Sequence, residues 1–398
     1  MAAALALSHP ANWQTNPADA FDLLCACAAQ AINPQAAVAP PPPVHAGFDW
    51  NGFIHLAEHH GVLALVAGDV LDRSEVPVEI KQSLHSFYAT NVKRSLWLAA
   101  ELTAILDHFA KKGVSAIPYK GPVLAQSAYG NLALRTFHDL DLLIPPAQFA
   151  PAKNALAEIG FHPSQAVSPP VERFYMRTGY ERSFDGAAGR NMVELQWDLL
   201  PRFYAVDCSA AGMSVDALLA RSGRISLGAA EVPCLSPEDS LLALCLHAAK
   251  HLWARLIWVA DISATLRSVE IDFDAVAHRA RAMGITRIVA VSLRLAEQLL
   301  HAQLPDAARQ LITRHPEELI LTNEFVARLT RSATYDFESA DYFLKIRRLR
   351  ERPSDRWRYL WRLLWTPGPG ELAAIKLPEP LFPLYRVVRL GRLLRKLG

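Results

Sequence analysis

Residues 119–144 read YKGPVLAQSAYGNLALRTFHDLDLLI, and the last eight of them, FHDLDLLI, decide the fold. In this apolar run Asp139 and Asp141 are separated by one leucine. Side chains alternate between the two faces of a β-strand, so both carboxylates would share a face while the leucines point into the sheet. Two unpaired charges there are costly. Close oxygen ligands are what Mg²⁺ takes from a protein, so the spacing predicts a metal and phosphate chemistry.

A strand, a turn and a helix are expected just upstream. Residues 114–119 (VSAIPY) are expected to form a short apolar strand. Lys120-Gly121-Pro122 follows, where Gly permits a sharp turn and Pro suits a first helical position. A helix is then expected over residues 123–129. Its N-terminal amides would favour an anion, and Lys120 adds a full positive charge.

Two further charged residues belong to this hypothesis. Arg135 lies just before the aspartates and is close enough in sequence to reach a phosphate held between turn and metal. Glu194 lies in another alternating run, MVELQW (192–197), and is the candidate third metal ligand or base if the two strands are adjacent. Lys120, Arg135 and Glu194 also have simpler interpretations. Lys120 would be a surface cation, Arg135 a partner that neutralises the acidic strand, and Glu194 a solvent-facing residue of an edge strand.

The chain resembles the uncharacterised nucleotidyltransferase family of the DNA polymerase beta-like superfamily. The resemblance rests on the 119–144 stretch with its Lys-Gly turn, Tyr-Gly, Arg and Asp-x-Asp, on VELQW (193–197), on LLALCLHAAKHLWARLIWVADISATL (241–266) and on the basic tail PLYRVVRLGRLLRKLG (383–398). The chain departs from that pattern at two points. Lys120-Gly121-Pro122 replaces the usual Gly-Ser or Gly-Gly pair, and Gln196 stands where the family commonly has a histidine.

The resemblance implies transfer of a nucleoside monophosphate, AMP from ATP, to an unidentified acceptor, with Mg²⁺ as cofactor and Mn²⁺ as its alternative. It implies that the catalytic and metal-binding residues are Asp139, Asp141 and Glu194. The implied nucleotide-binding residues are Lys120, Gly121, Arg135, Lys250, His251 and Asp261. His247 and His251 lie four residues apart, but no Glu follows the first as in HExxH, so lining a core or cleft is preferred to binding zinc.

The expected fold class is α+β, with a small mixed nucleotidyltransferase sheet flanked by N-terminal and C-terminal helical regions. A Ser236-Pro237 helix start follows the sheet segment. The expected domains are an N-terminal helical cap (1–112) with a Pro-rich linker near 33–47 that includes Pro40–Pro43, a nucleotidyltransferase core (113–232), a helical domain (233–344) and a basic amphipathic C-terminal segment (345–398).

Charge is distributed unevenly along the chain. Residues 345–398 hold fourteen Lys or Arg against four Asp or Glu, whereas the whole chain has a net charge of +2. Arginines at 386, 389, 392 and 395 recur at helical spacing. Such a segment binds phosphate-rich partners or membrane surfaces, or it packs its Leu and Val face on the core and leaves its arginines solvated. Peripheral membrane contact is one expectation, and a nucleic-acid partner is not preferred.

The sequence lacks the motifs that are typical of several other classes of protein. No apolar run is long enough to span a bilayer and no signal core follows the N-terminus, so a cytoplasmic location is expected. The five cysteines lack CxxC pairs, and the GxSxG, GxxxxGK[ST] and GxGxxG motifs are missing. The sequence therefore predicts a Mg²⁺-dependent nucleotidyltransferase. The alternative is a catalytically silent nucleotide-binding or interaction module that uses its basic C-terminal surface.

Overall fold

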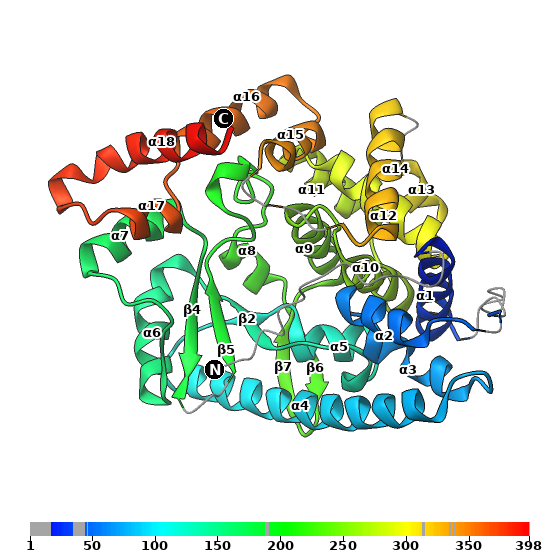
Figure 1. Cartoon of the computed structure of the whole chain (residues 1–398). Coiled ribbons are helices and arrows are strands. Elements are labelled where there is room, and N and C mark those ends of the chain that lie inside the picture. Colours follow the sequence, from blue (N-terminus) through cyan, green and yellow to red (C-terminus); the bar gives the residue numbers. More distant parts are fainter. Residues whose placement is uncertain are drawn as a thin grey trace.

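The computed structural model describes residues 17–34, 44–45, 47–187, 191–312, 315–333, 336 and 339–397. The predicted Pro40–Pro43 linker and residues 1–16 of the expected N-terminal helical cap lie outside these ranges. The first four helices are α1 (Pro17–Ile32), α2 (Trp50–His59), α3 (Leu63–Asp72) and α4 (Val78–Lys111). The last of these, α4, runs along one side of the molecule (Figure 1).

A small mixed sheet follows, with strand order β1-β2-β5-β4-β3. Its strands are β1 (Ile117–Pro118), β2 (Asp139–Leu143), β3 (Phe161–Pro163), β4 (Glu181–Gly186) and β5 (Met192–Gln196). The central pair, β2 and β5, is parallel, and the other pairs are antiparallel. A separate hairpin joins β6 (Gly223–Leu227) to β7 (Ala230–Cys234). The helices interspersed with these strands are α5 (Gly121–Tyr129), α6 (Phe149–Glu158), α7 (Pro169–Thr178) and α8 (Val215–Ala220).

The alternation predicted for residues 139–143 is present. Leu140 and Leu142 are buried with Val193 and Leu195 of β5 in a hydrophobic cluster that includes residues of α4 and α6. The opposite face of the sheet carries the polar residues. The apolar face thus fixes the strands against helices and leaves the carboxylates on the side of the candidate site.

Helices dominate the rest of the chain. They are α9 (Pro237–Lys250), α10 (Leu256–Ser268), α11 (Phe273–Met283), α12 (Thr286–Leu300), α13 (Asp306–Leu311), α14 (Pro316–Thr330), α15 (Ala340–Leu349), α16 (Pro353–Trp365), α17 (Pro369–Ala374) and α18 (Tyr385–Leu397). The predicted start of α9 is confirmed, since Ser236 Oγ accepts a hydrogen bond from the Asp239 amide. With helical regions on both sides of the mixed sheet, the α+β class is confirmed.

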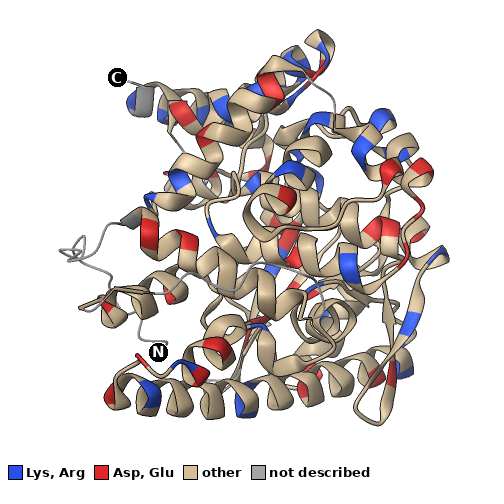
Figure 2. Cartoon of the chain, turned by 90° about the vertical axis from the view of Figure 1, so that its right-hand side faces the viewer, with Lys and Arg blue, Asp and Glu red and all other residues tan. Residues whose placement is uncertain are grey.

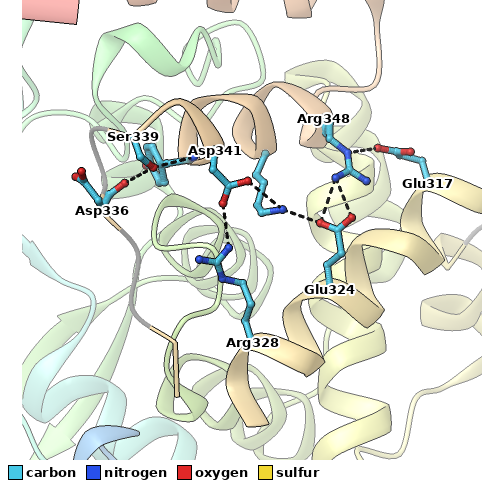
Figure 3. Close-up of polar contacts among 9 residues, drawn as sticks. Glu317, Glu324, Arg328, Asp336, Ser339, Asp341 and Arg348 are labelled. Atoms are coloured by element: carbon cyan, nitrogen blue, oxygen red, sulfur yellow. Dashed lines mark hydrogen bonds and ion pairs between the residues drawn. The ribbon is translucent and has the colours of Figure 1, made fainter. Parts of the chain in front are cut away.

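Ion pairs join α15 to α14 (Figure 3). Glu324 accepts hydrogen bonds from Lys345 at 2.7 Å and from Arg348 at 2.9 Å, and Arg328 donates to Asp341 at 2.9 Å. These contacts fix the start of the C-terminal segment to the helical body.

The C-terminal helices contradict the interpretation that this segment packs its Leu and Val face on the core and leaves its arginines solvated. Instead of being solvated, Arg389 is buried and, with Arg392, donates to the buried Glu371 at 3.3 and 2.8 Å. Val387 and Leu394 are 61% and 69% exposed. The burial of Glu371 explains why the arginines, and not Val387 and Leu394, face inward. A buried carboxylate without cationic partners would be costly. No described helix is both long and apolar enough to cross a membrane.

Candidate active site

The polar face of the sheet gathers three carboxylates. Asp139 and Asp141 share a face of β2 because they alternate with leucines, and Asp141 lies directly opposite Glu194 in the parallel β2–β5 ladder. Asp141 is 4% exposed. The sequence prediction that these residues come from adjacent strands is confirmed.

The Lys-Gly turn brings the N-terminus of α5 against this strand. Gly121 has a φ of +57°, which favours glycine, and an added Cβ would lie 3.5 Å from the Asp139 carbonyl oxygen. The preceding residue, Lys120, places its Nζ 2.8 Å from Asp141 Oδ1. Burial alone would lower the pKa of Lys120, but the Asp141 carboxylate outweighs burial and keeps that pKa above its ordinary value. Lys120 is therefore an internal cation, not a surface one.

Gln196 links the carboxylates to each other. Its Nε2 donates to Asp141 Oδ1 at 2.8 Å and to Glu194 Oε2 at 3.2 Å, while its Oε1 accepts from the Tyr119 hydroxyl at 2.8 Å. This is the position at which the resemblance noted from the motifs implies a histidine. Here the amide supplies two donors in place of an imidazole, and it keeps the two acidic side chains in fixed positions.

The carboxylates affect each other's protonation. Burial, together with the charges of Asp141 and Glu181, raises the pKa of Glu194 to about 8. Burial and Asp141 also raise the pKa of Asp139 above its ordinary value, although Lys120 and Arg135 act in the opposite direction. Burial and the neighbouring carboxylate therefore both favour the protonated forms of Asp139 and Glu194.

This donor set fits a divalent cation in its chemistry. Asp139, Asp141 and Glu194 offer only oxygen ligands, which Mg²⁺ prefers. Burial, and after it the charge of Asp141, raises the pKa values of Asp139 and Glu194, and a bound cation would favour their ionised forms. Across the described ranges, however, no three His, Cys, Asp or Glu side chains are arranged to hold a metal ion. Lys120 instead supplies the positive charge beside Asp141.

A cavity of about 510 Å³ opens beside the carboxylates; we call it the C-terminal cavity because residues 366–371 and α18 form part of its wall. Lys250 and His251 line it, as do Lys120, Asp139 and Glu194. Lys250 donates to the Tyr180 hydroxyl at 2.9 Å, and burial lowers the pKa of Lys250. The His251 ring stacks on Trp258 at a centroid distance of 4.7 Å.

Two wall residues of this cavity were not among the predicted site residues. Glu181 lies on the same face as Gln196, its neighbour across the β4–β5 ladder, and Glu181 Oε2 is buried with no hydrogen-bond partner in the described structure. His247 contributes to the wall, and burial lowers its pKa well below the ordinary value, so the imidazole is neutral. The sequence signal for Glu181 is weak, because the strand ERSFDG alternates only in part.

Two predicted nucleotide-binding residues, Arg135 and Asp261, form a buried ion pair with each other. Arg135 donates from Nε and Nη2 to the two carboxylate oxygens of Asp261 at 2.8 and 3.0 Å, and the Tyr129 hydroxyl donates to the same carboxylate at 2.9 Å. Asp261 is 1% exposed and lines neither this cavity nor the one described below. The buried pair fixes the segment before β2 to α10.

A mixed sheet whose parallel pair carries acidic residues beside a glycine turn has the organisation of a nucleotidyltransferase core. Comparison with models of known protein families matches residues 46–301 to a family described as uncharacterised nucleotidyltransferase. Since the match covers more than half of the chain, the protein belongs to this family, and the resemblance noted from its motifs is confirmed. No curated protein and no solved structure matched. The matched range ends before α13–α18.

Proposed function

We propose that the protein is a Mg²⁺-dependent nucleotidyltransferase that moves a nucleoside monophosphate, AMP from ATP, to an acceptor. The single observation that carries this proposal is the placement of Asp139, Asp141 and Glu194 on one face of adjacent strands, beside the Lys120-Gly121 turn. Mg²⁺ and NTP are abundant in the cytoplasm, where we place the reaction.

The proposed reaction is a displacement at the α-phosphorus. An oxygen of the acceptor, from a hydroxyl, phosphate or carboxyl group, forms a bond to this phosphorus, and the bond to the β-phosphate oxygen breaks to release pyrophosphate. A proton from a hydroxyl acceptor passes to a carboxylate, for which Glu194 is the candidate. Asp139, Asp141 and Glu194 would hold the cation, which when bound offsets the charge that develops on phosphate oxygens.

Thermal unfolding with each NTP, with and without Mg²⁺, tests the donor site. A ligand present at about 100 times its dissociation constant stabilises the folded state by about 2.7 kcal/mol. We expect one NTP to stabilise the wild type only with Mg²⁺, and the Asp139→Asn, Asp141→Asn double variant to lose this shift. Pyrophosphate release on addition of candidate acceptors then identifies the acceptor. The absence of stabilisation by every NTP would overturn the proposal.

The second candidate function is an interaction module, catalytically silent, that acts through the C-terminal helices. The observation in its favour is the exposure of Trp357 and Trp361, at 71% and 64%, on the arginine-rich α16. NTP binding without any pyrophosphate release across acceptor classes would favour this function over catalysis.

A further inference from the structure

A second cavity, also of about 510 Å³, lies next to the carboxylates. It shares Lys120, Asp139 and His247 with the C-terminal cavity, and its other wall residues come from α2 to α4, the segment before β2, and the start of α10. Because Arg94, Arg135 and Arg255 all line it, we call it the arginine cavity. Asp139 therefore lies between two cavities of equal volume.

Cationic groups converge in the arginine cavity. Arg94 Nη1 lies 2.8 Å from His138 Nδ1, although both groups carry or can acquire positive charge. Burial lowers the pKa of His138, and the charges of Arg94 and Arg255 lower it further. Within the described ranges neither Arg94 nor Arg255 forms an ion pair with a carboxylate, whereas Arg135 is neutralised by Asp261.

The acidic groups of this cavity do not remove the excess of positive charge. Besides Asp139 and Asp141, which would face the metal, its wall contains one carboxylate, Glu58, and that side chain pairs with His55 at 3.5 Å. Two guanidinium groups without carboxylate partners, placed beside a metal-ligand set, favour a polyanion that can bridge both.

The C-terminal cavity is more acidic in balance. Its wall contains four carboxylates, Asp139, Glu181, Glu194 and Glu371, against Lys120, Lys250 and two arginines that are both bound to Glu371. A triphosphate placed there would meet these carboxylates, one of which, Glu181, has a buried oxygen with no hydrogen-bond partner in the described part of the chain. That environment suits an acceptor with hydroxyl groups, because a hydroxyl can donate a hydrogen bond to a carboxylate.

We propose that the triphosphate of the donor nucleotide binds in the arginine cavity, where Arg94 and Arg255 contact its phosphates, and that the C-terminal cavity receives the acceptor. This inference rests on the proposed function. It assigns each of the two substrates to one side of the carboxylates and adds two donor-binding residues, one on α4 and one immediately before α10.

Titration calorimetry with ATP plus Mg²⁺, and with inorganic tripolyphosphate, tests the assignment. The Arg94→Ala, Arg255→Ala variant should bind both ligands at least about tenfold more weakly than the wild type. The matched control is Lys93→Ala, Arg267→Ala, which removes an exposed cation from each of the same helices, α4 and α10, outside both cavities. Both this control and Glu181→Gln should keep the tripolyphosphate affinity within about twofold.

The possible failures are distinguishable. If the Arg94→Ala, Arg255→Ala variant binds ATP as the wild type does, while Asp139→Asn, Asp141→Asn does not, the cavity assignment is wrong and the proposed function stands. A control variant that loses as much affinity as the arginine variant would also overturn the assignment, because the effect would then be nonspecific. If the wild type binds no NTP at all, both proposals fail. Unchanged thermal midpoints of the ligand-free variants exclude misfolding as the cause.

Discussion

Glu194 is the residue whose protonation most directly reports the state of the site. Its ordinary pKa of 4.5 rises to about 8 in the folded protein. Below the ordinary value the carboxyl group is protonated in both folded and unfolded chains. Between the two values only the unfolded chain ionises, so the metal-free protein loses up to about 1.4 kcal/mol of stability per pH unit as pH rises.

We therefore expect Glu194→Gln to flatten this pH dependence. The amide mimics the protonated carboxyl, so the variant should be more stable than the wild type at pH 8, and the difference should shrink toward pH 5. Denaturant unfolding in EDTA from pH 5 to 8.5 measures both slopes, with the exposed Glu270→Gln as control. Mg²⁺ should reverse the ranking at pH 8, since it favours the ionised wild type. Equal slopes for wild type and Glu194→Gln would contradict the explanation.

Single residues also show which features of the site could be predicted from the sequence. The shared face of Asp139 and Asp141 was predictable because strand alternation is a local rule. The partner of Arg135 was not, because Asp261 is 126 residues away and only the tertiary fold brings them together. Glu181 was missed for a similar reason: its place beside Gln196 depends on the β4–β5 register, which no local pattern specifies.

At the level of elements, Lys120 joins the start of α5 to β2 through its 2.8 Å contact with Asp141. The Asp141 side chain is buried, at 3% exposure, and that of Lys120 is nearly so, at 11%. Removing one partner of a buried ion pair leaves an uncompensated charge, which costs about 3–5 kcal/mol. The glycine turn was predictable from sequence, whereas the pairing of Lys120 with an aspartate instead of a phosphate required the structure.

We expect Lys120→Met to destabilise the metal-free protein by about 3–5 kcal/mol, and Mg²⁺ to restore a large part of this loss by neutralising Asp141. Chemical unfolding with and without Mg²⁺ measures both effects. Lys112→Met is the control, because Lys112 makes an exposed ion pair with Glu158, for which at most about 1 kcal/mol is expected. If Mg²⁺ stabilises Lys120→Met no more than the wild type, the metal does not bind beside Asp141.

Some helices and strands could not be predicted fully from the sequence, because their extent or orientation depends on tertiary contacts. The apolar run 114–119 forms only the two-residue β1, because just Ile117 and Pro118 pair with β2. The hairpin of β6 and β7 was not predicted at all, since its burial pattern is mostly exposed or intermediate and gives no clear alternation. In α18, helical spacing was predictable but not its orientation, which the buried Glu371 decides.

Over the whole molecule, basic helices occupy the side opposite α4, and Lys and Arg recur along them (Figures 1 and 2). On α16 the exposed Trp357, Trp361 and Leu364 are spaced for a single outward stripe, with Arg358 exposed next to it. Tryptophans on an arginine-rich amphipathic helix are typical of segments that lie in the interface of an anionic membrane.

We expect the protein to cosediment with vesicles that contain an anionic phospholipid but not with purely zwitterionic vesicles, and to be released by salt, because each Lys or Arg near such a surface contributes about 1 kcal/mol. Trp357→Ala, Trp361→Ala should lower the partition coefficient at least about tenfold through lost apolar burial. Trp97→Ala, which removes a 44% exposed tryptophan from α4, should leave it unchanged. Equal binding by all three proteins, or binding to RNA or protein but not to vesicles, would show that these helices serve another partner.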